Sequence, residues 1–390
     1  MKNTDVLIVG AGFAGAVSAR VLADAGKKVV ILEKRNHIGG NAYDWIDEND
    51  VMRHEYGPHI FHTSSEKAVQ FLSRFTGWYD YEHRVLGCIE DQLVPIPFNL
   101  TSIEKLFDAQ KADHLKDVLI RTYGMEKKVP ILELRKSEDP EIRELAEYIF
   151  EHVFKYYTMK QWGYTAEEID PAVTGRVPVL VSYDDRYFQD TFQKMPDQGY
   201  TAMFEKMLDH ENIQVCLNTE AMDHLRVDAE QGCVYVDGEK FDGIVIFTGL
   251  VDQLLGYTNG DLPYRSLEFD VQSKAGQYQP VTTVNYPTPA EVNPYTRITE
   301  YKNMMKDAPK EKTTIAVEYP YKYNRTGEKG NVPYYPVFTD DSKAMYAAYV
   351  EKLKAVPNIY LLGRLAEYKY YNMDQITDAA LAFAEKLLEK

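Results

Sequence analysis

A glycine-rich turn near the start of the chain restricts the possible folds more than any other feature. Residues 4–9, TDVLIV, are apolar and rich in β-branched side chains, as in a buried parallel strand, and GAGFAG (10–15) follows directly. AVSARVLADAG has the apolar spacing of a helix that ends at Gly26, and KKVVILE (27–33) has the composition of a second strand. These elements predict a βαβ unit with G-x-G-x-x-G at the start of its helix, the pattern of dinucleotide-binding folds.

Each glycine of this motif has a separate role. Gly10 allows the tight turn, Gly12 lets the backbone approach a diphosphate, and Gly15 lets the helix pack closely on the strand. The free N–H groups at the start of the helix would face the phosphates. Glu33 ends the second strand, where a carboxylate accepts hydrogen bonds from the adenosine ribose. The sequence therefore predicts a bound adenine dinucleotide; the alternative is a glycine-rich turn with an unrelated surface glutamate.

The segment after the second strand favours FAD over NAD. EKRNHIGGNAYD (33–44) contains a second glycine pair, and no third alternating βα repeat follows it. In flavoproteins a glycine-rich loop at this place lets the chain pass close to the FAD diphosphate. The sequence contains no second G-x-G-x-x-G, so we expect no separate domain for a reducing nicotinamide cofactor. Three possibilities stay open: a partner reduces the flavin, oxygen oxidises it, or the overall reaction is redox-neutral.

Later segments predict that the nucleotide domain is discontinuous. DGIVIFTG (242–249) and NIYLLG (358–363) have the composition of further buried strands of the same sheet. The predicted fold is α/β (α+β overall), with a Rossmann-like FAD-binding domain, a helical domain and an antiparallel β-sheet domain. We expect these domains to comprise, in that order, residues 1–78, 196–262 and 338–390; residues 79–172; and residues 173–195 and 263–337.

Charge and cysteine usage exclude several classes of protein. The 390 residues include 44 Lys and Arg against 60 Asp and Glu, for a net charge of −16, which argues against nucleic acid or an anionic membrane surface as partners. The three cysteines, Cys88, Cys216 and Cys233, form no CxxC pair, which argues against a disulfide framework or a thiolate metal site. This usage fits a reducing compartment, so we expect a cytoplasmic protein. No apolar run approaches the roughly 18 residues of a membrane span.

Three arginines beside turn-forming residues are candidate phosphate ligands. Arg176 lies in AVTGRVPV, Arg297 in NPYTRITEY, and Arg364 directly after Gly363. The planar guanidinium group matches two phosphate oxygens at once. For each arginine the alternative is a surface or ion-paired side chain. These arginines would indicate an anion site only if the fold brings their side chains together.

An aromatic segment, FKYYTMKQWG (154–163), is a candidate stacking wall. On a helix, Phe154 and Tyr157 are three residues apart, and Thr158 and Trp162 are four apart, so that the side chains could share one face. A flat base such as uracil would stack there. The alternative is an aromatic face of the hydrophobic core.

Two histidines, His59 and His62 in EYGPHIFHT (55–63), could in principle bind a metal. No further cluster of Cys, His or acidic residues has matching spacing, so we expect no metal. Contact with a flavin ring is the preferred interpretation.

The end of the chain predicts a capped helix. GRLAEYKYYNMDQ (363–375) precedes an apolar stripe of Ile376, Ala379 or Ala380, Phe383 and Leu387. Asn372 is placed as N-cap and Gln375 three residues later completes a capping-box-like pair. The positive end of this helix would point at the flavin ring.

The motifs together resemble the bacterial UDP-galactopyranose mutase family. The matching segments, in family order, are IVGAGFAGAV, EKRNHIGGNAYD, YGPHIFHT, YTMKQWG, GRVPV, DDRYF, PYTRITE, PYYPV and GRLAEYKYYNMD. The resemblance implies an isomerase that interconverts UDP-galactopyranose and UDP-galactofuranose, which supplies galactofuranose for cell-surface glycans. It implies FAD that must be reduced, with no net redox change. In the family mechanism, flavin N5 attacks the anomeric carbon and UDP leaves.

The resemblance also assigns residues. Those expected to be catalytic are Arg176, Arg297, Tyr335, Tyr370, Arg364, Asn372 and His62. Those expected at the substrate are Phe154, Tyr157, Thr158, Trp162, Arg176, Tyr187, Asn285, Arg297, Tyr335 and Tyr370. Those expected at the cofactor are Gly10, Gly12, Phe13, Gly15, Glu33, Lys34, Gly40, Asn41, His59, Ile60, Gly363, Arg364, Asn372 and Met373.

Within this assignment, Arg176 and Arg297 would clamp the diphosphate, with Arg176 on a mobile loop of about 168–179 that closes over the substrate. Hydroxyl donors to the phosphates would be Tyr187, Tyr335 and Tyr370. Phe154 and Tyr157 would hold the uracil, Trp162 would border the sugar pocket, and Asn285 would face the substrate. His59, Ile60 and His62 would lie along the flavin, and Arg364 would contact FAD and the substrate region.

One residue departs from the family pattern, and other functions stay open. Many family members have Asp where this chain has Asn372, which puts a general acid or base there in doubt. A flavin-dependent oxidase of the amine-oxidase type shares the nucleotide fold, and a non-catalytic flavin- or UDP-sugar-binding protein is a further alternative. The resemblance implies as partners the UDP-sugars, an external reductant and a second copy in a homodimer. It also assigns substrate binding and dimerisation to the helical domain, 79–172.

Overall fold

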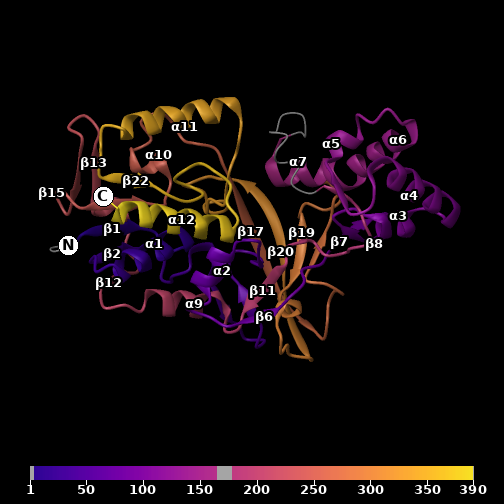
Figure 1. Cartoon of the computed structure of the whole chain (residues 1–390), viewed down its shortest axis with the longest axis horizontal. Coiled ribbons are helices and arrows are strands. Elements are labelled where there is room, and N and C mark those ends of the chain that lie inside the picture. Colours follow the sequence, from indigo (N-terminus) through magenta and orange to yellow (C-terminus); the bar gives the residue numbers. More distant parts are fainter. Residues whose placement is uncertain (1–3, 165–177, 390) are drawn as a thin grey trace.

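The computed structural model describes residues 4–164 and 178–389 of the chain. Figure 1 shows that the described ends of the chain lie near one another at one end of the molecule, and that the helices of residues 100–149 occupy the opposite end. The long strands of residues 264–275 and 312–322 lie between these two ends. Among the described residues, no helix has the length and apolar composition needed to cross a membrane.

A five-stranded parallel sheet forms the nucleotide-binding part. The strand order is β12-β2-β1-β16-β22, and every neighbouring pair is parallel. The strands are β1 (Val6–Val9), β2 (Val29–Leu32), β12 (Ile213–Cys216), β16 (Ile244–Phe247) and β22 (Ile359–Leu361). This confirms the four strands expected at 4–9, 27–33, 242–249 and 358–363, and one sheet thus joins three distant parts of the chain. The sequence analysis missed β12.

The two faces of this sheet are covered by different layers. Val6 and Ile8 of β1 pack into one hydrophobic core, whereas Leu7 and Val9 pack into another, as the alternation of a strand requires. The first layer contains α1 (Phe13–Asp24), α2 (Glu66–Leu72), α9 (Gly199–Leu208) and α12 (Met373–Leu388). The second contains β13 (Leu225–Asp228), β14 (Cys233–Val236), β15 (Glu239–Phe241), α10 (Val251–Leu254) and α11 (Asp340–Leu353).

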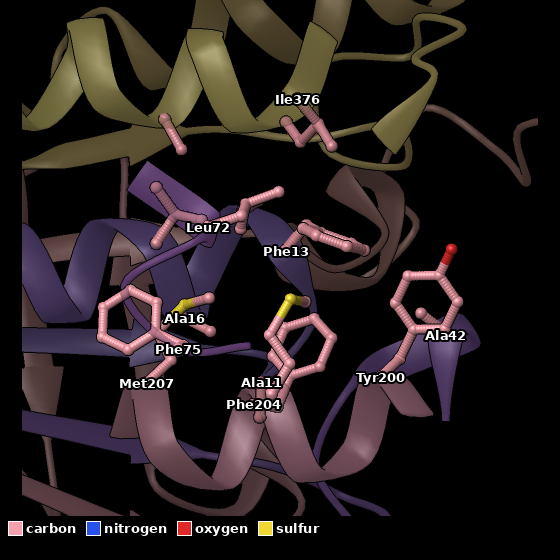
Figure 2. Packing of buried hydrophobic residues seen from close by; sticks show 14 of the residues in the cluster. Ala11, Phe13, Ala16, Ala42, Leu72, Phe75, Tyr200, Phe204, Met207 and Ile376 are labelled. Carbon is pink, nitrogen blue, oxygen red and sulfur yellow. The ribbon is translucent and has the colours of Figure 1, made fainter. Parts of the chain in front are cut away.

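Helix α1 is packed on several sides. Figure 2 shows Phe13 at its start, with Leu72 and Ile376 on one side and Phe204 and Met207 on the other. The Phe13 and Phe204 rings meet edge to face, with their centroids 4.9 Å apart. This packing fixes the start of α1, which is the end that faces the candidate ligand.

A seven-stranded sheet lies beside the nucleotide-binding part. Its order is β21-β17-β20-β19-β18-β7-β8, and all neighbours are antiparallel except β18 and β7. The strands are β7 (Val85–Ile89), β8 (Gln92–Ile96), β17 (Tyr264–Ala275), β18 (Thr283–Asn285), β19 (Arg297–Glu300), β20 (Lys312–Lys322) and β21 (Tyr335–Pro336). The sheet expected from residues 263–337 is therefore present, but it is not purely antiparallel.

Two segments of the expected domain division lie elsewhere in the structure. The β7–β8 hairpin belongs to the seven-stranded sheet, although its residues fall within the range 79–172 that the sequence assigns to helices. Its turn residues, Glu90 (φ 49°) and Asp91 (φ 60°), have the positive φ angles of a tight hairpin without the Asn-Gly or Asp-Gly signal that reveals one in a sequence. Strand β11 (Phe192–Pro196) pairs with β5 (Phe61–Thr63) and β6 (Trp78–Asp80), not with the large sheet. The remaining domain boundaries stay a prediction.

The helical part has its own hydrophobic core. It contains α3 (Leu100–Leu106), α4 (Ala109–Tyr123), α5 (Ile131–Leu134) and α6 (Pro140–Ile149). The Asp108 side chain caps α4 at the Lys111 N–H, and Asp139 caps α6. A π-helical turn (Phe150–Lys155) and α7 (Tyr156–Trp162) continue from α6, so that the aromatic segment 154–163 begins in one wide turn and continues into α7.

Short elements complete the fold. They are the pairs β3 (Asp44–Ile46) with β4 (Met52–His54) and β9 (Lys127–Val129) with β10 (Val179–Val181), and the 3-10 helices Gly40–Ala42, Ala221–Asp223 and Tyr301–Met304.

Three histidines are largely shielded from water: His54 and His83 are buried, and His59 is half-buried. Burial lowers the pKa of His54, His59 and His83 to about 3, so each stays neutral at neutral pH. The Nδ1 atom of His54 accepts a hydrogen bond from the His59 N–H at 3.0 Å, and its ring stacks on Tyr301. The unfolded chain would protonate these side chains near pH 6.5, whereas the folded chain would not.

The contact between α1 and β1 generates a first prediction. A Cβ atom at Gly15 would lie 2.0 Å from the Gly10 carbonyl oxygen, so the helix would have to move away from the strand. We expect Gly15→Ala to lower the free energy of unfolding by about 1–3 kcal/mol, measured by urea denaturation. Gly12→Ala is the matched control, because its φ is −83° and its Cβ would have no neighbour closer than 3.6 Å. Equal stability of the two variants would contradict this account.

The buried histidines generate a second prediction. Between pH 6.5 and about 3 the unfolded state binds more protons than the native state, so stability falls as the pH falls, by about 1.4 kcal/mol per pH unit for each histidine. His54→Asn keeps an acceptor for the His59 N–H but removes one titrating group. We expect urea denaturation between pH 7 and pH 5 to show a flatter loss of stability for this variant. An unchanged slope would mean that His54 is protonated in the native protein.

Candidate active site

A long cleft opens at the carboxyl edge of the five-stranded sheet. It contains about 1330 Å³ of empty space, part of which is open to solvent. Gly10, Glu33, Thr248 and Gly363 line it. The first three directly follow β1, β2 and β16, and Gly363 lies two residues after the end of β22. Ligands of open parallel sheets bind at this edge.

Two glycine-rich loops meet in the floor of the cleft. A Cβ atom at Gly40 would lie 2.9 Å from the Cα atom of Gly12, so the two chains approach as closely as glycine allows. Gly12 is the N-cap of α1 and contributes no capping side chain, which leaves the helix start available to an anion. The site therefore has the form of a diphosphate cradle.

Glu33 is held in position beside this cradle. Its side chain is buried; Oε2 accepts from the Ala11 N–H and Oε1 from the Arg35 N–H, both at 2.9 Å. Each carboxylate oxygen keeps a lone pair for a further donor. A fixed carboxylate next to a diphosphate cradle fits the ribose of an adenine dinucleotide, so the residues present match the expected cofactor class.

Most of the residues expected at the cofactor line the cleft, namely all except Gly15 and Ile60. Gly15 faces β1 instead, and Ile60 is buried in the core. The sequence analysis missed a second group of lining residues, which includes Arg35, Thr219, Glu220, Met222, Gly249, Gln253, Tyr334 and Tyr371. Those at 219–222 and 248–250 follow β12 and β16, and the rule that ligands bind at strand ends would have found them.

A row of polar residues crosses the seven-stranded sheet. Arg297 lies opposite Asn285 on one side and Glu318 on the other, so all three side chains share one face. Nε and Nη2 of Arg297 both lie 2.7 Å from Oε2 of Glu318, which is itself buried. Burial alone would lower the pKa of Arg297, but the charge of Glu318 raises it above its usual value. Arg297 is therefore a fixed, permanently charged donor.

Asn285 adds an acceptor without a partner to this row. Its Oδ1 atom is buried, and no hydrogen-bond partner lies near it within residues 4–164 and 178–389. A buried polar atom of this kind usually has a partner, so its lack of one marks a place where a ligand fits.

Arg364 connects the cofactor cleft to a cluster of tyrosines. It lines the cleft, and its Cζ atom lies 5.1 Å from the ring centroid of Tyr335 and 5.0 Å from that of Tyr370. Its Nη2 donates to the Tyr371 carbonyl at 2.8 Å. The Trp162 ring approaches Tyr335 from α7, with centroids 6.1 Å apart.

The charges of these residues act on one another. Burial is the main cause that raises the pKa of Tyr335, followed by Tyr370, whereas Arg364 and Arg297 lower it. Burial also raises the pKa of Tyr157, and Arg297 opposes that shift. Arg297 and Arg364 therefore converge on one tyrosine-rich region, as an anion site requires. Arg176 and most of the loop 168–179 lie outside the described residues.

The aromatic segment divides between two roles. Phe154 lies in the π-helical turn and is buried in the core of the helical part, so the alternative interpretation, a core aromatic residue, describes its packing. Thr158 and Trp162 lie in α7, and Trp162 reaches the Tyr335 ring of the sheet. The segment thus joins the helical core to the tyrosine cluster.

The two histidines of EYGPHIFHT also separate. His59 lines the cleft, with its Nδ1 2.8 Å from the Gly57 carbonyl oxygen. His62 does not line it; its Nδ1 lies 2.8 Å from Oδ2 of Asp190, and its ring stacks on Phe188 at 3.5 Å. No group of three potential metal ligands occurs in the part of the chain that the structure describes.

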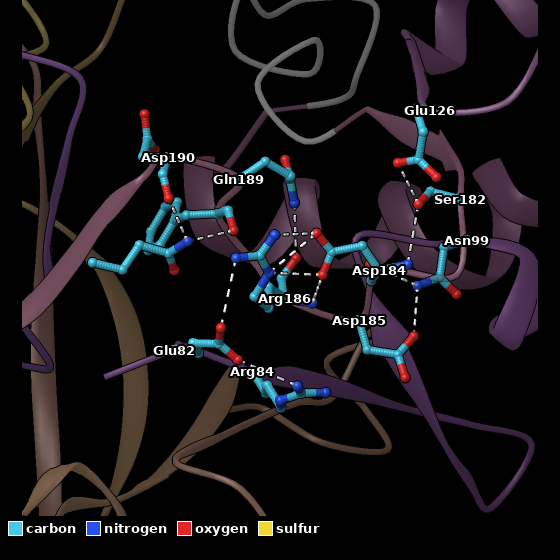
Figure 3. A network of polar contacts seen from close by, with 12 residues as sticks. Glu82, Arg84, Asn99, Glu126, Ser182, Asp184, Asp185, Arg186, Gln189 and Asp190 are labelled. Atoms are coloured by element: carbon cyan, nitrogen blue, oxygen red, sulfur yellow. Dashed lines mark hydrogen bonds and ion pairs between the residues drawn. The ribbon is translucent and has the colours of Figure 1, made fainter. Parts of the chain in front are cut away.

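A polar network holds the DDRYF segment that carries Tyr187 (Figure 3). Arg186 binds both carboxylate oxygens of Asp184, at 2.7 and 2.9 Å, and lies 3.6 Å from Glu82. The Asn99 amide donates to Asp185 at 2.8 Å. The Tyr187 N–H donates to the His83 carbonyl at 2.7 Å, so both the side chains and the backbone of this segment are fixed.

The start of α12 also faces the cleft. Asn372 is its N-cap, and the Asn372 N–H donates to Oε1 of Gln375 at 3.0 Å, which confirms the expected pair. Asn372 and Met373 line the cleft, and Ile376 and Ala380 are buried. The positive ends of α1 and α12 therefore open on the same cleft.

Family models match the sequence in two parts. A model described as UDP-galactopyranose mutase matches residues 152–370, and one described as an NAD(P)-binding Rossmann-like domain matches residues 8–75. The second match covers the end of β1, all of α1 and β2, and the glycine-rich loops of the cleft.

Curated relatives cover the chain almost from end to end. The UDP-galactopyranose mutase of Mycoplasma pneumoniae is 36% identical and covers 99% of this chain and 96% of its own length. The dTDP-fucopyranose mutase of Escherichia coli is 34% identical and covers 97% of each chain. A crystal structure of reduced UDP-galactopyranose mutase has the same fold, with a TM-score of 0.73 over 99% of this chain and 96% of that one, at 17% identity. The chain belongs to the UDP-galactopyranose mutase family.

Proposed function

We propose that the protein interconverts UDP-galactopyranose and UDP-galactofuranose with reduced FAD as cofactor. The observation that carries this proposal is the position of Arg364, which lines the dinucleotide cleft and also contacts Tyr335 and Tyr370. The cofactor cleft and the candidate anion site therefore share a wall. A nucleotide sugar bound by these donors would present its anomeric carbon to the cofactor.

Two groups of cleft residues would bind the two ends of FAD, the adenosine diphosphate and the flavin ring. Glu33 would bind the adenosine ribose, and Gly12, Gly40 and the start of α1 would hold the diphosphate. His59, Arg364 and the start of α12 would lie along the flavin ring. Bound, reduced flavin supplies a nucleophilic nitrogen for the anomeric carbon of the sugar.

The chain itself would stabilise the leaving group. When the bond to UDP breaks, negative charge develops on the β-phosphate, and fixed donors in a desolvated site stabilise that charge best. Arg297 is held by Glu318, and the raised pKa of Tyr335 keeps its hydroxyl protonated and able to donate. Tyr370 and Tyr187 would add further hydroxyl donors. Asn285 would accept a hydrogen bond from the substrate through its unpartnered oxygen.

The same proposal extends to partners and surroundings. An external reductant would reduce the flavin, because the sequence has a single G-x-G-x-x-G and so no second dinucleotide motif of this type. We also propose a cytoplasmic homodimer that supplies galactofuranose for surface glycans. Residues 79–172 would form its helical, substrate-binding part.

An anaerobic assay tests the proposal. Dithionite-reduced protein is incubated with UDP-galactofuranose, and we expect UDP-galactopyranose to form, with far less product from the oxidised protein. The same assay with dTDP-fucopyranose separates the two substrates named for the relatives. Turnover of the dTDP-sugar alone would overturn the proposed substrate, and peroxide release with amine substrates in air would favour the oxidase alternative.

Arg297 provides a prediction for this function. We expect Arg297→Ala to lower kcat/KM by at least about 100-fold, equivalent to roughly 3 kcal/mol, because a fixed donor to the leaving phosphate is lost. Near-wild-type turnover would overturn the assignment. Since this variant leaves Glu318 buried without its partner, Arg297→Ala/Glu318→Gln serves as a second variant, and thermal unfolding shows whether each is folded.

Asn372 provides a further prediction. Asn and Asp cap helices about equally well, so Asn372→Asp should keep the melting temperature within a few degrees. It would add a negative charge beside the flavin ring, which disfavours the anionic reduced form. We therefore expect a lower flavin reduction potential or a higher KM. Asn372→Ser is the control, since it caps without adding charge. If the Asp variant matches it in both quantities, residue 372 is only a cap.

A further inference from the structure

We propose that Lys160 is a positioning residue that ties α7 to the hairpin loop between Asn285 and Arg297. Through this tie, the α7 side chains that border the substrate region keep a fixed position relative to the phosphate donors of the sheet. The inference rests on the proposed function, because it concerns the geometry of the same site.

The contacts of Lys160 are unusual for a lysine. Its Nζ donates to the carbonyl oxygens of Tyr286 at 2.7 Å, Asn293 at 2.9 Å and Tyr295 at 2.7 Å. An ammonium group has three N–H donors, so these three carbonyls use all of them. No carboxylate lies within ion-pair distance of Lys160 among the described residues. Burial lowers its pKa to about 8.

The three carbonyls belong to the one loop that joins β18 to β19. Tyr286 directly follows Asn285, and Tyr295 lies two residues before Arg297. The loop is closed at its base, where the Tyr286 N–H donates to the Thr296 carbonyl at 2.9 Å. A cation bound at the centre of this loop therefore fixes both of the strand ends that carry the candidate substrate ligands.

Arg265 fixes the same turn of α7 from the other side. Its Nε donates to the Gln161 carbonyl at 2.8 Å and its Nη2 to the Lys160 carbonyl at 2.9 Å. These carbonyls belong to the last turn of α7, which has no helical partners for them and carries partial negative charge. Gly163 follows with φ of 74°, and a Cβ atom there would lie 2.8 Å from Nη1 of Arg265.

Arg265 links that turn to the tyrosine cluster. It lies opposite Tyr335 across the β17–β21 pair, and its carbonyl accepts from the Tyr334 N–H at 2.9 Å. Lys160 thus joins α7 to Asn285 and Arg297, while Arg265 joins it to Tyr335. These contacts explain the sequence KQWG. The Lys160 side chain binds the loop, the Lys160 and Gln161 carbonyls accept from Arg265, and Gly163 leaves room for the Arg265 side chain. The Trp162 ring faces Tyr335.

Burying part of a lysine without a counter-charge costs free energy, and an apolar side chain would fill the same space at lower cost. The three hydrogen bonds recover this cost only while the loop keeps its shape. The arrangement therefore favours one loop conformation over all others, which is what a preorganised phosphate site requires.

The test compares Lys160→Met with Lys302→Met in the full-length FAD-bound protein. Lys302 is the matched control, because its Nζ also donates to a backbone carbonyl, that of Gly276 at 2.6 Å. Unlike the Lys160 contacts, this contact does not hold candidate ligands, since neither Lys302 nor Gly276 lines the cleft. For Lys160→Met we expect unchanged flavin content and absorption, and a Kd for UDP and a KM for UDP-galactofuranose raised about tenfold or more. The change in kcat should be smaller than the change in KM.

Hydrogen–deuterium exchange provides a second readout that does not depend on turnover. For Lys160→Met we expect faster exchange in peptides covering 286–296 and 156–162. In Lys160→Arg, which retains a donating cation, the exchange rates of both peptides should stay closer to those of the wild type. Lys302→Met should lower the melting temperature without changing Kd, KM or exchange in these peptides. If Lys160→Met behaves like Lys302→Met in all of these, Lys160 is only a structural lysine. If the wild-type protein itself does not turn over UDP-galactofuranose, that result counts against the proposed function and not against the role of Lys160.

Discussion

The close contact between Gly15 and the carbonyl of Gly10 is the constraint on which the cleft depends. It brings α1 against β1, so that the helix begins where the strand ends and its unsatisfied N–H groups face the cleft. The second glycine loop can then approach α1 so closely that a Cβ atom at Gly40 would lie 2.9 Å from the Cα atom of Gly12. A side chain at Gly15 or Gly40 would clash with the backbone of the neighbouring segment and move the two segments apart.

The overall charge of the protein makes local cations more important. A net charge of −16 repels a nucleotide sugar at long range, so attraction must come from donors at short range in a desolvated site. Three described cations of the candidate substrate region are each fixed by a different kind of partner. Arg297 binds the carboxylate of Glu318, Arg364 lies against two tyrosine rings, and Lys160 binds backbone carbonyls. Only the first of these partners is an anion. The N–H donors of Lys160 are all used by carbonyls, so Lys160 positions α7 and does not itself bind the ligand.

The sequence predicted the parts of the fold that depend on neighbouring residues. The strands and helix around G-x-G-x-x-G, the capped start of α12 and the position of Glu33 beside the cleft all follow from local patterns. The hairpin at 85–96 was missed because its turn residues carry no Gly or Asn signal. Glu318 was missed for a different reason. In TTIAVEY it has the position of an ordinary polar residue on an alternating strand, and only the register of β19 against β20 brings it to Arg297.

The same limit explains why Lys160 could not be identified from its spacing. Along the helix it is one of several polar residues in an aromatic-rich segment, and its partners are backbone carbonyls more than 120 positions away. Helix α7 begins in the core of the helical part, through Phe154 in the preceding π-helical turn, and ends against the seven-stranded sheet. A movement that displaced the last turn of α7 from the sheet would have to break the hydrogen bonds of both Lys160 and Arg265. The wide π-helical turn just before α7 is the place where the helix can absorb such a movement while its last turn stays fixed.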